Sequence, residues 1–320
     1  MNPKRSSTTF VQRHFRELSV AAALLVVLGV LATFAPAFFN PQPLLSLATR
    51  EAPTLIVAAG LALVIIARQI DVSVGSQLGV CSVVAGLLAA AQTPVYLVVP
   101  ATLATGALLG AVNGALIAGL KLPSIVVTLA TLVTWREALR WQRQGEFVNL
   151  PDHLQWFGWS QMTGQWLLIA TALGVILVLA LVTRHLSAGR YIYAVGSDAE
   201  AARLAGLRPR LVTFGTFVVL GTLVGLAAIL NVVQSPQADP KSGTGLELKA
   251  IAAVVVGGVA ISGGRGTLGG VFVGVLLLAC VAPALVHLRI EAYWEKALQG
   301  AIILLAVVAD GLRQRRAVKA

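Results

Sequence analysis

Charged residues are scarce in this sequence. Of its 320 residues only 12% are charged, whereas 57% are hydrophobic, and the mean hydropathy is +0.85. A soluble domain carries about 25% charged residues, so the composition excludes that class and indicates a polytopic membrane protein. Cysteine is almost absent as well. Cys81 and Cys280 both lie inside apolar runs, and a disulfide framework is therefore not expected.

Catalytic and metal-binding motifs are missing too. The glycine-rich stretch "GGVAISGGRGT" lacks the lysine of a phosphate-binding loop, so we do not expect this chain to hydrolyse ATP. No H-E-x-x-H motif, Cys/His cluster or G-x-S-x-G elbow occurs. The sequence therefore predicts a chain that is not an enzyme and that has neither a cofactor nor a metal site. The four histidines are scattered: His14, His153, His185 and His287.

Acidic residues are few, 13 against 24 lysines and arginines, which gives a net charge of +11. In a soluble domain this excess would suggest a nucleic-acid partner, but in a membrane protein it suggests the positive-inside rule. Apolar windows separated by charge, glycine or proline predict an all-α bundle of about ten transmembrane spans. These are 19–38, 53–67, 75–91, 94–118, 124–140, 165–183, 211–233, 249–261, 267–286 and 294–309.

The charge balance supports this topology. With the N-terminus inside, 16 basic and five acidic residues face the cytoplasm, and eight of each face outward. All the net charge then lies on one side, which predicts an inner-membrane protein with both termini in the cytoplasm and no nucleic-acid partner. The expected parts are a basic N-terminus (1–18), a transmembrane domain (19–309) with a cytoplasmic loop (184–210), and a basic tail (310–320).

Small residues recur at a spacing of four, a pattern that lets helix backbones approach closely in lipid. We expect two such packing faces, Gly106/Gly110/Gly114 and Gly266/Gly270/Gly274. The segments "DVSVGSQLGV" and "SGGRGTLGGV" are weakly alike and suggest an internal repeat.

One polar stretch interrupts the apolar chain, "YAVGSDAEAARLAGLRPRLV" at 193–212. Ser197 and Glu200 match the S-x-x-E capping box that begins a helix. Glu200 and Arg203 would share one face, and Gly206 would end the helix in a left-handed conformation. The result is a helix of about two turns, too short to cross a bilayer and therefore placed on the cytoplasmic surface.

Two functions fit this short helix. It could be an amphipathic connector that binds lipid headgroups, or a docking element for a soluble protein. Lipid-binding helices carry large apolar residues, whereas a small-sided helix fits a protein groove. The second function is favoured because the apolar side consists of Ala199, Ala202, Leu204 and Ala205.

Uncharged polar residues at membrane depth are candidates for a solute path, since they are costly there without partners. The alternative for each is a hydrogen bond that joins two helices. Asp71 is expected first to cap a helix and second to belong to a cytoplasmic gate. The path candidates are Asn113, Thr128, Thr131, Asn231 and Gln234.

The longest outer loop, 141–164, carries Trp156, Phe157 and Trp159. These aromatic residues fit a belt at the membrane interface, or a surface on which a binding protein docks. In the second case a polar rim is expected from Arg143, Glu146, Asp152, Asp239, Lys241 and Glu247.

The segment "EAARLAG" (200–206) resembles the E-A-A-x-x-x-G loop of permease subunits of binding-protein-dependent ABC importers. Further segments resemble the ribose, xylose, rhamnose and autoinducer-2 branch, with the autoinducer-2 and rhamnose permeases most alike. Arg265 departs from the pattern, at a position where related chains vary. These segments are "RQIDVSVGS" (68–76), "NGALIAGLKLPSIVVTLATL" (113–132), "YAVGSDAEAARLAGL" (193–207) and "TGLELKAIAAVVVGGVAISGGRGTLGG" (244–270).

The resemblance implies a ten-span permease that pairs with a copy or a paralogue and receives its solute from a periplasmic binding protein. It implies docking of an ATPase with two nucleotide-binding halves. The family's coupling residues carry over onto Glu200, Ala201, Ala202 and Gly206, and Ser197 and Arg203 complete the predicted helix. The solute would be a small sugar or sugar-like molecule of rhamnose, autoinducer-2 or pentose type.

The sequence disfavours two other classes of function. A self-contained secondary transporter or channel would need ionisable residues within its spans, and the sequence places almost none there. An intramembrane enzyme would need a pair of catalytic residues at depth, and no such pair is found.

Overall fold

The chain is helical through most of its length. The computed structural model describes residues 15–291, 293–304 and 308, and the expected all-α class is confirmed. The elements are α2 (Phe15–Phe34), η1 (Pro36–Phe39), α3 (Pro41–Ile66), α4 (Val74–Ala90), α5 (Val95–Gly114), the π-helical η2 (Ala115–Gly119), α6 (Ser124–Arg143), β1 (Val148–Asn149), η3 (Asp152–Gly158), α7 (Gln161–His185), α8 (Ser187–Ser197), α9 (Ala199–Leu204), α10 (Pro209–Val232), β2 (Gln237–Ala238), α11 (Leu246–Val256) and α12 (Leu268–His287). Residues 294–304 are also helical.

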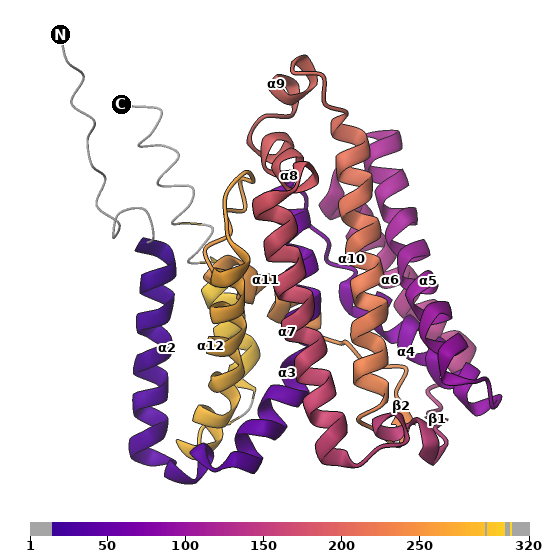
Figure 1. Cartoon of the computed structure of the whole chain (residues 1–320), viewed down its shortest axis with the longest axis vertical. Helices are drawn as coiled ribbons and strands as arrows, with labels where there is room; N and C mark the ends of the chain where they lie inside the picture. Colours follow the sequence, from indigo (N-terminus) through magenta and orange to yellow (C-terminus); the bar gives the residue numbers. More distant parts are fainter. Residues whose placement is uncertain (1–14, 292, 305–307, 309–320) are drawn as a thin grey trace.

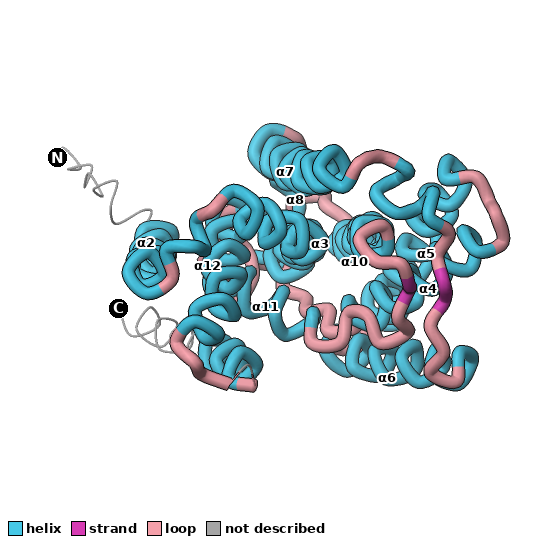
Figure 2. The backbone as a smooth tube through the Cα atoms, turned by 90° about the horizontal axis from the view of Figure 1, so that it is seen from below, coloured by secondary structure: helices cyan, strands magenta, loops and turns pink. Residues whose placement is uncertain are grey.

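The long helices lie side by side along the longest axis of the molecule (Figure 1). Helix α9 lies at one end of this bundle, and the β1–β2 pair lies at the other. Seen along the axis, α3 and α10 occupy the middle, α2 lies outside α12, and α4, α5 and α6 form the opposite flank (Figure 2). The second half of α3 is accordingly buried from Ile56 to Ile66. This central pair of helices is therefore the core against which the others pack.

Five helices are long and apolar enough to cross a membrane. They are Pro41–Ile66, Val95–Gly119, Gln161–His185, Pro209–Val232 and Leu268–Val286, and Ser19–Phe34 and Val74–Ala90 are shorter apolar helices. The polytopic class is thus confirmed, whereas the number of ten spans stays a prediction.

The expected span at 249–261 does not form as one helix. Helix α11 has only 11 residues, about 16 Å at the usual rise, against a hydrocarbon core of about 30 Å. The chain leaves the helix at Gly257 and resumes at Leu268. A similar break separates α3 from α4 between residues 67 and 73. Two interrupted helix pairs therefore lie inside the bundle.

Glycine brings α5 and α10 into backbone contact. A Cβ atom added at Gly106 would overlap the carbonyl oxygen of Gly221, and one added at Gly110 would overlap that of Phe217. Gly114 faces the Phe214 and Phe217 side chains of α10. The predicted packing face at 106, 110 and 114 is confirmed.

The second predicted glycine face is confirmed in part. Gly270 and Gly274 of α12 pack against the backbone of Gly257 and Ala253. Gly266, however, precedes α12 and has a φ of +145°, so it belongs to the loop rather than to the helix face. The repeated spacing predicted a contact but extended it one turn too far.

Candidate functional site

Helix α9 begins at an aspartate. The Asp198 carboxylate accepts hydrogen bonds from the backbone N–H groups of Glu200 and Ala201, both at 2.9 Å. Ser197 is instead the last residue of α8, so the predicted capping box is wrong. Asp198 is the cap because one charged oxygen of its carboxylate accepts hydrogen bonds from both free N–H groups at the helix start.

Glu200 is thereby available for an ion pair. The Arg203 guanidinium donates from Nη2 to Glu200 Oε1 at 2.6 Å and from Nε to Oε2 at 3.0 Å. This hydrogen bonding lowers the pKa of the Glu200 carboxyl below its usual value. The predicted shared face is confirmed, and both side chains are more than 60% exposed.

The end of α9 is also as predicted. Gly206 has a φ of +86°, a conformation that glycine adopts without strain. Its N–H donates to the carbonyl of Arg203, and the N–H of Leu207 donates to that of Ala202, both at 3.0 Å. A defined cap at each end makes this short helix a fixed shape rather than a frayed turn.

The side chains of α9 divide into one that packs inward and others that face solvent. Ala202 is buried, whereas Ala199, Glu200, Ala201 and Arg203 are exposed, and Leu204 is 76% exposed. Of the predicted coupling residues, Ala202 therefore anchors the helix. Glu200, Ala201 and Arg203 form the exposed surface together with Leu204, which we call the α9 surface.

A second group of functional residues lies deep in the protein around Asp71. Its carboxylate accepts hydrogen bonds from the Ser73 N–H (2.8 Å) and hydroxyl (2.6 Å), and from the side-chain amides of Gln77 (3.2 Å) and Asn113 (3.4 Å). All four residues are buried. This Asp71 cluster joins the loop at 67–73 to α4 and α5 through neutral donors.

The prediction that Asp71 caps α4 is wrong. The helix begins at Val74 with Ser73 in the cap position, three residues after Asp71. The buried carboxylate instead accepts the N–H of Ser73, two residues further on, in a tight turn. Its place as a gate candidate stays a prediction.

Four of the five predicted path residues make hydrogen bonds. Besides Asn113 in the Asp71 cluster, Thr128 donates to the Ile70 carbonyl of the loop at 67–73 at 3.3 Å, and Thr131 donates to the carbonyl of Thr128 in its own helix. Gln234, which lies in the turn after α10, donates to the Leu230 carbonyl of that helix at 2.7 Å. Asn113 and Thr128 therefore match the alternative of bonds that join separate segments, whereas the bonds of Thr131 and Gln234 are local.

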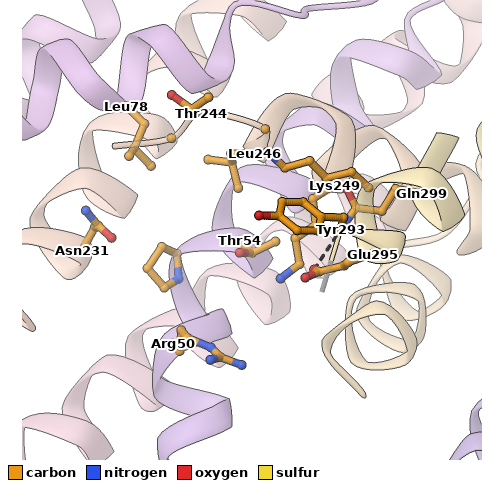
Figure 3. Close-up of a pocket in the computed structure, with 14 residues that line it drawn as sticks. Arg50, Thr54, Leu78, Asn231, Thr244, Leu246, Lys249, Tyr293, Glu295 and Gln299 are labelled. Atoms are coloured by element: carbon orange, nitrogen blue, oxygen red, sulfur yellow. Dashed lines mark hydrogen bonds between the residues drawn. The ribbon is translucent and has the colours of Figure 1, made fainter. Parts of the chain in front are cut away.

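Asn231 differs because it lines a cavity of about 470 Å³ (Figure 3). This size is typical of sites for small molecules. The cavity lies between α3, the end of α10, the start of α11 and the segment after α12. Its polar lining includes Arg50, Thr54, Asn231, Lys249, Lys296 and Gln299.

Two ion pairs, each with a buried carboxylate and a half-buried cation, connect α11 to neighbouring helices. Lys249 Nζ lies 2.7 Å from Glu51 Oε1 of α3, and Arg136 Nη2 of α6 lies 3.3 Å from Glu247 Oε1. Glu247 is only 8% exposed, so its predicted place on a docking rim is wrong. The spacing of Glu247 and Lys249 is a clue to this in the sequence, because two residues two positions apart on a helix contact different neighbours.

The two segments predicted to face outward meet at the end of the bundle away from α9. Strand β1 pairs antiparallel with β2, Val148 opposite Ala238 and Asn149 opposite Gln237. The Trp156 N–H donates to the Val233 carbonyl at 2.9 Å. The loop at 141–164 and the loop before α11 therefore form one joined surface.

Comparison with known proteins identifies relatives along nearly the whole chain. Residues 43–307 match the family described as "Branched-chain amino acid transport system / permease component". The chain is 36% identical over 301 residues to the autoinducer 2 import system permease protein of Enterobacter sp. (strain 638), covering 93% of this chain and 88% of that protein. It is 32% identical over 311 residues to the ribose import permease protein of Escherichia coli (strain K12), covering 95% and 97%. No solved structure matches.

The cap of α9 gives a direct test of the site geometry. Replacing Asp198 by alanine removes the acceptor of two N–H groups, which costs about 1 kcal/mol. Amide hydrogen exchange at Glu200 and Ala201 should therefore accelerate roughly fivefold. Ser197→Ala is the matched control and should leave both rates unchanged. Faster exchange in the serine variant alone would restore the capping box.

Proposed function

Since this chain belongs to the family of transport-system permease components, we propose that it carries a small sugar or sugar-like solute into the cell. The chain is the membrane-embedded subunit of an ABC importer in the bacterial inner membrane and not an enzyme. It works with an ATPase and a periplasmic binding protein. Solutes of autoinducer-2 or pentose type are supported by the names of the two relatives, and rhamnose stays a third candidate from the sequence resemblance.

The alternative of a self-contained secondary transporter is less well supported. Of the buried carboxylates, Glu51 and Glu247 are each paired with a cation, whereas Asp71 is held by the neutral donors of Ser73, Gln77 and Asn113. A paired carboxylate is poorly suited to take up and release a coupling ion. Energy then comes from the partner ATPase, which has two nucleotide-binding halves, and a second permease, a copy or a paralogue, completes the complex.

The α9 surface is the proposed docking site of the ATPase. The observation that carries this proposal is a doubly capped helix at the tip of the bundle whose ion pair and Leu204 face solvent. An apolar side chain framed by a fixed charged pair fits a protein groove. The buried Ala202 anchors the helix that carries this surface, and Ser197 ends α8 directly before it.

Glu200→Lys tests the docking proposal. The change reverses the charge at the centre of the α9 surface and removes the ion pair with Arg203. Insertion into the membrane should be intact, but the ATPase should no longer co-purify, and solute uptake should be lost. Gly206→Val, which strains the end of the helix, should act in the same direction.

Glu137→Lys is the matched control for this charge reversal. Glu137 and Arg140 form the same exposed pair three residues apart on α6, at 2.9 Å. We expect the ATPase to co-purify with this variant as with the unchanged protein. Normal uptake in Glu200→Lys would exclude α9 as the docking element.

The orientation in the membrane follows from the charge pattern and the position of α9. Both termini, the N-terminal segment 1–18 and the tail 310–320, are proposed to lie in the cytoplasm with the loop at 184–210, and residues 19–309 form the permease domain. These terminal segments lie outside the described residues, apart from the backbone of 15–18. The outer loops would then form the surface that meets the binding protein.

Reporter fusions test this orientation. A reporter fused after Arg210, just beyond α9, should be active only in the cytoplasm. One fused at Gly158, in the loop that joins β1 to α7, should be active only in the periplasm. The opposite pattern would reverse the proposed topology.

The solute path is proposed to include the cavity that Asn231 lines. Helix α10 begins shortly after α9 and runs away from it along the bundle (Figure 1). Asn231 is the last but one residue of this helix. The cavity therefore lies toward the outer end of the bundle, where a binding protein would release its solute. Hydroxyl, amide and charged side chains together suit a molecule with several hydroxyl groups. In this arrangement Asp71, Asn113, Thr128 and Thr131 lie nearer the cytoplasm, as a gate would.

Asn231→Leu and Gln234→Leu separate the two path candidates at the end of α10 and in the turn after it. Loss of the Asn231 amide should lower uptake roughly tenfold, because one hydrogen bond is worth about 1 kcal/mol or slightly more. Gln234, in the turn after α10, bonds to the Leu230 carbonyl and is not part of the cavity lining. Uptake by Gln234→Leu should therefore be nearly unchanged when equal amounts of complex are compared. Equal losses would contradict the assignment of the cavity.

A further inference from the structure

The end of α8 touches both helix breaks of the bundle. Gly196, the last but one residue of α8, is buried. A Cβ atom added to it would overlap the carbonyl oxygen of Ile66, the last residue of α3, and would lie 2.8 Å from the N–H nitrogen of Gly264. Backbone therefore lies on backbone here, with no side chain between.

The two breaks also bind each other at this point. The Gly264 N–H donates to the Ile66 carbonyl at 2.8 Å. A Cβ atom added at Gly263 would lie 2.7 Å from the Gly196 carbonyl oxygen and from Arg68 Cβ. Three segments distant in the sequence thus meet, and we call the contact of Ile66, Gly196 and Gly264 the Gly196 junction.

A second contact fixes the same helix to the same loop. The Tyr193 hydroxyl donates to the Gly266 carbonyl at 2.8 Å. Tyr193 precedes Gly196 by three residues, so both lie on one face of α8. That face therefore cannot shift without moving the loop between α11 and α12.

Each break leads from the junction to a group already described. Five residues beyond Ile66, the first loop reaches Asp71 and its bonds to α4 and α5. The second loop continues α11, which carries Lys249, paired with Glu51, at the cavity wall. The α9 surface follows α8 directly in the chain, because Asp198, which caps α9, comes immediately after Ser197, the last residue of α8.

We propose that Gly196 is the positioning residue through which movement of α9 reaches both helix breaks, and through them the Asp71 cluster and the cavity. This inference rests on the proposed docking of the ATPase at α9. Tightly packed backbone segments transmit a displacement because no flexible side chain is present to absorb it. The absence of a side chain at position 196 is thus a requirement of the transport cycle.

The test uses the complete importer, with its ATPase and binding protein, reconstituted in vesicles. In Gly196→Ala the new methyl group separates α8 from Ile66. The ATPase should still co-purify because the α9 surface is unchanged. The number of solute molecules imported per ATP hydrolysed should fall roughly tenfold or more, within the usual range of coupling between sites. Hydrolysis should no longer respond to the loaded binding protein.

Gly215→Ala is the matched control, since no atom lies within 4 Å of a Cβ added at that position of α10. Its ratio of import to hydrolysis should equal that of the unchanged protein. Tyr193→Phe is a second, milder variant that removes only the hydroxyl bonded to Gly266. It should assemble in normal amounts and lower the ratio severalfold.

The outcomes separate this inference from the docking proposal. An unchanged ratio in assembled Gly196→Ala overturns the role of Gly196. If that variant does not assemble, Tyr193→Phe decides, and an unchanged ratio there overturns it equally. Loss of the ATPase from Glu200→Lys together with normal coupling in Gly196→Ala would overturn only this inference. Retention of the ATPase and uptake in Glu200→Lys would instead overturn docking at α9.

Discussion

Inside a bilayer every backbone polar group needs a partner within the protein, and this requirement governs how the helices of this chain can be interrupted. The bond from the Gly264 N–H to the Ile66 carbonyl meets that requirement for one polar group of each interruption. The two interruptions are thereby joined to each other inside the protein.

That pairing restricts the residues around it. Because two loops and the end of α8 converge, the space left at position 196 admits no side chain. The first loop continues as the Asp71 cluster, where neutral amides and a hydroxyl satisfy a buried carboxylate. A small backbone contact and a polar cluster are thus parts of one structure, and displacement of one changes the geometry of the other.

The sequence allows prediction of features that depend on local patterns. The glycine spacing of α5 predicts its contact with α10, because a helix repeats its faces regardless of its partners. The stop at Gly206 and the pair of Glu200 with Arg203 are local in the same sense. The cap was mispredicted although it is local, because Ser197 and Asp198 compete and only the turn between α8 and α9 decides which side chain reaches the free N–H groups.

Features that depend on distant partners could not be predicted in this way. Glu247 is separated from Arg136 by 111 residues, and its neighbours in the sequence resemble an outer loop. The end of α11 is hidden from a hydropathy window in another way, since its apolar run continues past the point where the helix ends. The helix stops before Gly258, which has a φ of +90°, and the backbone of Gly257 packs against that of Gly270 in α12.

The arrangement also explains how a chain without ATP chemistry can take part in active transport. If the ATPase docks at α9 and the solute passes through the cavity, as proposed, work done by the ATPase enters at one end of the bundle and must reach a cavity near the other. A long helix passes on such a displacement as a rigid rod, but a broken one does so only if its break is held by a further contact. Helix α8 supplies that contact for both breaks through Gly196 and Tyr193. The interruptions that weaken the helices individually are therefore the places where one movement can be distributed to several of them.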